Sequence, residues 1–83
     1  MVCVRLKEAI RQRVLDLCRE RDITVNKLAT ISGITQSTLN NIVNGRNNST
    51  TVSTVQKICD GLDMTIQDFF DADVFRDLEQ EVK

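Results

Sequence analysis

The stretch from Thr24 to Gly45, TVNKLATISGITQSTLNNIVNG, constrains the fold of this chain most strongly. Thr24 and Thr35 can each cap a helix, because a threonine hydroxyl accepts hydrogen bonds from the unpaired amides of a first turn. Gly33 lies between them, where a positive φ lets the chain reverse without the steric cost of a Cβ. Ala29 leaves room for a second backbone to approach closely. The stretch therefore predicts two short helices that cross at a tight turn.

The second of these helices has two different faces. Leu39 and Ile42 recur at helical spacing and define a buried stripe, and Gly45 follows just after the last turn. The opposite face carries uncharged polar side chains: Gln36, Ser37, Asn40, Asn41 and Asn44. A carboxamide donates and accepts at once, so it can match an adenine edge in the major groove. A polar face alone is typical of a solvated helix, but the preceding turn favours nucleic-acid recognition.

Several short motifs together give the chain a family likeness. They are Leu28-Ala29, Gly33-Ile34, Asn44-Gly45 and the later segment LDMTIQDFF. With these motifs the chain resembles the Cro and repressor family of phage and bacterial DNA-binding proteins, an XRE-type helix-turn-helix family. The likeness covers roughly residues 6 to 70, nearly the whole domain. It implies an all-α fold, a compact five-helix repressor-like domain with no cofactor.

The resemblance also implies which side chains contact double-stranded DNA. Base contacts are implied for residues at matching positions of the third helix: Gln36, Ser37, Asn40 and Asn41. Phosphate contacts are implied for Thr24, Thr35, Asn44 and Arg46. In the family, the polar loop that contains Arg46 lies over the DNA backbone, so Arg46 is the best single candidate for a phosphate contact.

Several positions depart from the family's pattern. Val25 stands where many members have a phosphate-binding Gln, and Asp63 where many have a left-handed Gly, a conformation that Asp tolerates well. In many members of the family, an Arg on helix one and a Glu near the end of helix three form an internal ion pair. In this chain Cys18 and Val43 stand at these two positions. Removing one partner alone would strand a charge. The double replacement therefore predicts that Cys18 and Val43 pack within about 4.5 Å of each other.

The rest of the chain predicts three further helices. The first is expected over residues 4–21, and most of its arginines are interpreted as ordinary solvated charge (Arg11, Arg13, Arg19, Arg21). Thr51 is expected to cap a fourth helix with an apolar stripe of Val52, Val55, Ile58 and Leu62. Thr65 to Asp68 resembles a capping box for a fifth helix, which is followed by Phe69 and Phe70.

The C-terminal residues form a separate prediction. Residues 1–71 are expected to be the DNA-binding domain, and residues 72–83 an acidic extension. The spacing of Val74 or Phe75, Leu78 and Val82 favours a sixth, amphipathic helix, with a frayed acidic tail as the alternative. The apolar residues here and in the fifth helix exceed the needs of one small core, which predicts a homodimer through this region.

Charge is strongly polarised along the chain. Residues 1–58 hold nine Lys and Arg against four Asp and Glu, whereas residues 59–83 hold two against eight. Basic residues displace counterions from DNA phosphates. We therefore expect the acidic C-terminal region to point away from DNA, toward another protein or solvent.

Composition indicates a non-enzyme. The chain has no His, and Cys3, Cys18 and Cys59 are too widely spaced for a disulfide framework or the usual zinc site. They are interpreted as small hydrophobes, Cys59 at a family Ala position, with a redox role for Cys3 or Cys18 left open. No apolar run is long enough to span a membrane and no signal-peptide pattern is present. A cytoplasmic location is expected.

Two functions are consistent with these features. The first is a dimeric, sequence-specific transcriptional regulator that reads the major groove with its third helix. The alternative is an antitoxin-like or adaptor module, in which the same fold serves mainly to bind a protein partner. A steep salt dependence of DNA binding would favour the first.

Overall fold

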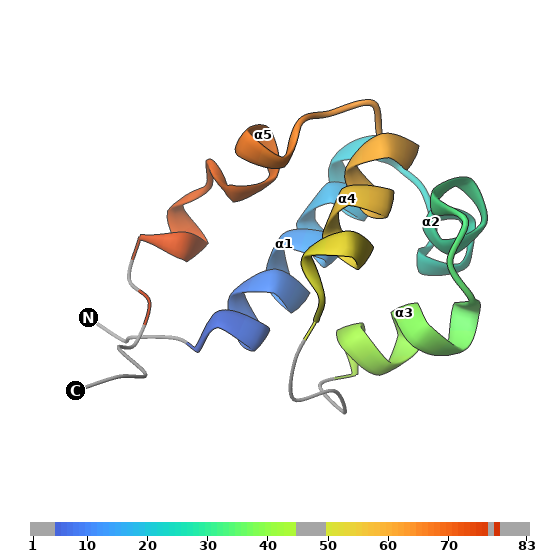
Figure 1. The fold of residues 1–83 in the computed structure, drawn as a ribbon, viewed down its shortest axis with the longest axis horizontal. Coiled ribbons are helices and arrows are strands. Elements are labelled where there is room, and N and C mark those ends of the chain that lie inside the picture. The colour runs from blue at the N-terminus through green and yellow to red at the C-terminus, as the bar shows by residue number, and fades with distance from the viewer. Residues whose placement is uncertain (1–4, 45–49, 77, 79–83) are drawn as a thin grey trace.

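The computed structural model describes residues 5–44, 50–76 and 78, and its helices follow the order predicted from the sequence. They are α1 (Leu6–Arg21), α2 (Val25–Ser32), α3 (Gln36–Val43), α4 (Val52–Gly61) and α5 (Ile66–Phe70), followed by a single 3₁₀ turn, η1 (Asp73–Phe75). The predicted all-α, five-helix fold is confirmed. The segment with α5 and η1 runs back beside α1 toward the N-terminal end of that helix (Figure 1).

Threonine caps begin four of the five helices. The backbone is extended at each of these caps, which are Thr24, Thr35, Thr51 and Thr65. Each hydroxyl accepts a hydrogen bond from the amide three residues later, and the four distances, in chain order, are 3.0, 3.1, 3.2 and 3.0 Å. Each cap satisfies one of the amides that a helix N-terminus leaves without an intrahelical partner. The predicted caps are confirmed.

Left-handed residues close the turns. Gly33 has φ 72° and ends α2, as its place at the corner predicts. Asp63 has φ 56° after α4, and Asp22 has φ 54° after α1. Asn44 ends α3 with φ −90°, and the predicted closing residue, Gly45, lies outside the described residues.

The core lies between the helices and takes one apolar stripe from each. Its fully buried members include Val14 of α1, Leu28 of α2, Leu39 of α3, Ile58 of α4 and Phe69 of α5. In a domain of this size one such core supplies most of the favourable free energy of folding.

The two cysteines that the structure describes are buried free thiols. Cys18 and Cys59 belong to the core, and burial raises the pKa of both thiols. This fits their interpretation as small hydrophobes. Val43 is half-buried against the same core, and its direct contact with Cys18 stays a prediction. Cys3 lies outside the described residues.

Val74 and Phe75, where the predicted sixth helix would begin, lie in the 3₁₀ turn η1, and residues 77 and 79–83 of that helix lie outside the described residues. Ala72 is extended, with φ −148° and ψ 150°, and η1 follows it directly. The ring of Phe75 lies 4.9 Å from that of Phe70 and 6.0 Å from that of Phe69. These ring contacts pack η1 against α5. The last predicted apolar residue, Val82, lies outside the described residues.

Candidate nucleic-acid interface

The α2–α3 pair is held on the core by small and apolar side chains at its crossing. Leu28, Ala29 and Leu39 are completely buried, and Ile34 of the turn packs against the same cluster. Helix α2 also approaches α4 closely. A Cβ built on Gly61 would lie 2.6 Å from Ser32 Oγ and 2.9 Å from the Ile31 carbonyl oxygen. Only a glycine allows this approach, a requirement that the sequence analysis missed.

The predicted base-contact residues share the outer face of α3. Gln36, Ser37 and Asn40 are exposed, and Asn41 is half-buried. Asn44, which caps the helix, is also exposed. Since the opposite face is buried through Leu39 and Ile42, the polar face is the one that α3 presents to solvent.

Three of the predicted phosphate-contact residues lie at helix ends: Thr24 before α2, Thr35 before α3 and Asn44 after α3. Thr24 is exposed, and its hydroxyl accepts from the Lys27 amide. The Thr35 hydroxyl donates to Thr38 Oγ1 at 2.8 Å while it accepts from the Thr38 amide. A phosphate oxygen only accepts hydrogen bonds, so the Thr35 hydroxyl reaches it only by giving up this bond. Arg46 lies outside the described residues.

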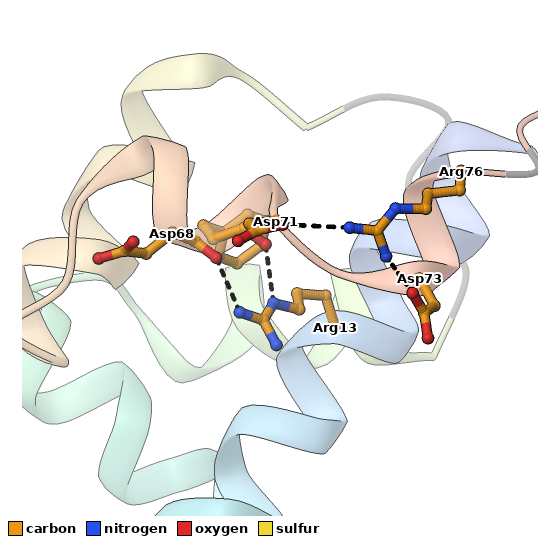
Figure 2. Close-up of polar contacts among 6 residues, drawn as sticks. Arg13, Asp68, Asp71, Asp73 and Arg76 are labelled. Carbon is orange, nitrogen blue, oxygen red and sulfur yellow. Dashed lines mark hydrogen bonds and ion pairs between the residues drawn. The ribbon is translucent and has the colours of Figure 1, made fainter.

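The prediction that most arginines of α1 are ordinary solvated charges is wrong for three of them. Arg11 Nε donates to the Val43 carbonyl at 2.6 Å, at the end of α3. Arg13 donates to the carbonyls of Asp68 and Phe69 at 2.9 and 2.7 Å, at the end of α5 (Figure 2). Arg21 Nη1 donates to the Leu62 carbonyl at 2.8 Å, directly after α4.

These bonds share a physical cause. The last carbonyls of a helix have no intrahelical partner and lie at the negative end of the helix dipole, where a guanidinium is favoured. Helix α1 therefore holds the C-terminal ends of three other helices. The interpretation as solvated charge fits Arg19, which makes only an exposed 3.6 Å pair with Asp16 among the described residues.

Acidic side chains gather around α5 and η1. Arg76 pairs with Asp71 at 3.3 Å and with Asp73, as Figure 2 shows. All three side chains are largely exposed, so these pairs contribute little to stability. Asp68 is exposed nearby. The acidic side chains that the structure describes here thus lie on different elements from the polar face of α3.

Comparison with known proteins agrees with this arrangement. The model of the Cro/C1-type HTH DNA-binding domain matches residues 13–73, which include all five helices in whole or part. The chain belongs to this family. The predicted resemblance is confirmed, and with it DNA binding as the general role of the domain.

One solved structure is similar over nearly its whole length. Protein 11 of prophage Lp1 matches with a TM-score of 0.78 and 29% sequence identity, over 90% of this chain and 99% of that one. The comparison with curated proteins gave no match. Among the described residues of this Cro/C1-type domain, no helix is long and apolar enough to cross a membrane.

Proposed function

We propose that this protein is a non-enzymatic regulator of transcription that binds a specific double-stranded DNA sequence, reading the major groove with α3. The observation that carries the proposal is the uncharged face of α3, formed by Gln36, Ser37, Asn40 and Asn41, on a helix whose other face is fixed to the core. Carboxamides that are exposed and held in place can recognise adenine edges. The expected place of action is the cytoplasm.

Selection of bound sequences from random duplex DNA tests this proposal. A defined consensus sequence is expected. Gln36→Ala and Asn41→Ala should then each weaken binding to that consensus by roughly 1 to 3 kcal/mol, with little change for scrambled DNA, because each removes base contacts and no charge. Unchanged affinity of the Gln36→Ala variant for the consensus would contradict base recognition by α3.

Phosphate contacts complete the proposed interface. We assign them to Thr24, Thr35, Asn44 and Arg46. The amides of the first residues of α2 and α3 add donors that a helix N-terminus offers to an anion. Arg46→Ala should weaken binding to all sequences alike and reduce the slope of affinity against salt by about one unit. A change limited to the consensus sequence would instead make Arg46 a base contact.

A homodimer through α5 and the residues after it is also part of the proposal. Phe70 is 38% exposed and Ile66, one turn earlier, is 36% exposed. Together with Leu78, also 38% exposed, they supply apolar surface beyond the core. Two-fold symmetry would place paired half-sites about 34 Å apart. Sedimentation of the free protein and of its DNA complex tests this, and a monomer at high micromolar concentration in both would exclude the dimer.

The same apolar surface, with the acidic Asp68, Asp71 and Asp73 beside it, supports the second candidate function, an antitoxin-like or adaptor module. DNA affinity that does not depend on salt would favour this candidate.

The division into a domain of residues 1–71 and an extension of residues 72–83 stays a prediction.

A further inference from the structure

The two ends of α3 are fixed in different ways. Its N-terminal end is held by the Thr35 cap, which is local in sequence. At its C-terminal end the Asn44 amide reaches the carbonyl of Asn40, and the carbonyl of Val43 accepts from Arg11 Nε at 2.6 Å. Arg11 precedes Val43 by 32 residues, so this bond joins α3 to α1 across the domain.

We infer that Arg11 is a positioning residue for base recognition, which fixes the last turn of α3 against α1. The inference rests on the proposed role of α3 in reading DNA. Helix α3 has only eight residues, and only Leu39 and Ile42 are buried. In a helix so short, whose core contacts are Leu39, Ile42 and the half-buried Val43, a charge-assisted bond at the last turn adds to the constraint on its orientation.

The effect of this bond is not uniform along α3. Val43 belongs to the same helical turn as Asn40 and Asn41, whereas Gln36 is at the other end, directly after the Thr35 cap. Displacement of the last turn would therefore move the asparagine side chains and leave Gln36 in place. Arg11 should be coupled to Asn41 in specific binding and independent of Gln36.

The inferred role of Arg11 is exerted through Val43 and differs from that of a phosphate contact. Its Nε is committed to the Val43 carbonyl, and removal of the side chain frees the end of the helix. A phosphate contact would instead weaken binding to every sequence and lower the salt slope by about one unit. The two roles therefore predict different results for the same variant.

NMR spectroscopy of the free protein tests the structural half. A scalar coupling is expected between Arg11 Nε and the Val43 carbonyl carbon. Arg11→Ala should shift that carbon and speed amide exchange in the last turn of α3, with the amides after Thr35 unchanged. Matching shifts and exchange rates in the wild-type protein and the variant would overturn the inference whether or not the protein binds DNA.

DNA titrations test the functional half, with two matched controls. Arg11→Ala should lower affinity for the selected consensus by about three- to tenfold, with scrambled DNA and the salt slope unchanged. Arg21→Ala removes the same charge and a comparable bond to a carbonyl, but at the end of α4. Arg19→Ala removes an exposed charge from the same helix. Both controls should retain the wild-type ratio of consensus to scrambled affinity.

Double-mutant cycles locate the effect. Arg11→Ala combined with Asn41→Ala should cost less affinity than the two single changes together, whereas its combination with Gln36→Ala should be additive. Additivity with both would overturn the inference, as would a reduced salt slope. If the NMR results hold and no sequence is selected from random DNA, the proposed function fails, and the recognition role of Arg11 fails with it.

Discussion

Replacing Gly61 with alanine is expected to destabilise the domain, although alanine is the better helix former. The added Cβ would lie 2.6 Å from Ser32 Oγ, 2.9 Å from the Ile31 carbonyl oxygen and 3.0 Å from Ser32 Cα. The first neighbour is a side-chain atom that can rotate away. The other two are backbone atoms of α2, so relief requires the α2–α4 crossing to open.

The magnitude follows from two opposing effects. Overpacking against atoms that cannot move separately costs about 1–3 kcal/mol, and the backbone contacts of Gly61 place it near the upper end. Helix propensity returns at most about 1 kcal/mol. We therefore expect a net loss of about 2 kcal/mol in the free energy of unfolding, or about 8–16 °C in Tm for a domain of this length.

Urea unfolding followed by circular dichroism measures this loss, and further variants at Gln56 and Ser32 help to interpret it. Replacing Gln56, which is exposed on the same helix, with Ala and with Gly measures how much helix propensity alone changes the free energy of unfolding. Ser32→Ala removes the 2.6 Å neighbour and leaves the Ile31 carbonyl, so it should recover only part of the loss caused by Gly61→Ala. A Gly61→Ala variant as stable as the wild type would refute the steric argument.

Further outcomes follow from other contacts. Ser32→Ala alone should stabilise the fold by about 1 kcal/mol in the same urea experiment, because Ser32 Oγ is buried without a hydrogen-bond partner among the described residues. Arg13→Ala should cost about 1–3 kcal/mol through its two carbonyl bonds. Cys18 should react slowly with thiol reagents, since burial raises its pKa. For the same reason stability should fall as pH rises past the ordinary thiol range, where the unfolded chain ionises first. Cys18→Arg should destabilise the fold, and adding Val43→Glu should recover part of that loss if the two side chains are adjacent.

Local signals made much of the fold predictable from the sequence. A threonine cap acts on an amide three residues away, so Thr24 and Thr35 identify helix starts without knowledge of the fold. Gly33 identifies a turn because few other residues tolerate a positive φ, whereas the turn at Asp63 was expected from the resemblance to the family. The polar face of α3 was predictable as the complement of its apolar stripe.

The features that were missed depend on pairs far apart in the chain. The carbonyl that accepts from Arg11 belongs to a valine, and any residue offers the same acceptor, so no side chain identifies the partner. Gly61 has no positive φ, and its requirement arises from the approach of Ser32 on another helix. The short 3₁₀ turn at residues 73–75 likewise depends on where the ring of Phe75 finds its neighbours.

The arginine bonds of α1 also determine how the domain can be divided. A fragment of residues 1–58 would contain both helices of the helix-turn-helix, but it would lack the carbonyls that accept from Arg13 and Arg21 and the buried ring of Phe69. In this fragment the guanidinium groups of Arg13 and Arg21 would lack their partners, and one side of the core would be open. The helix-turn-helix of this protein is therefore not a portable unit, and a graft onto another scaffold would need the C-terminal segment as well.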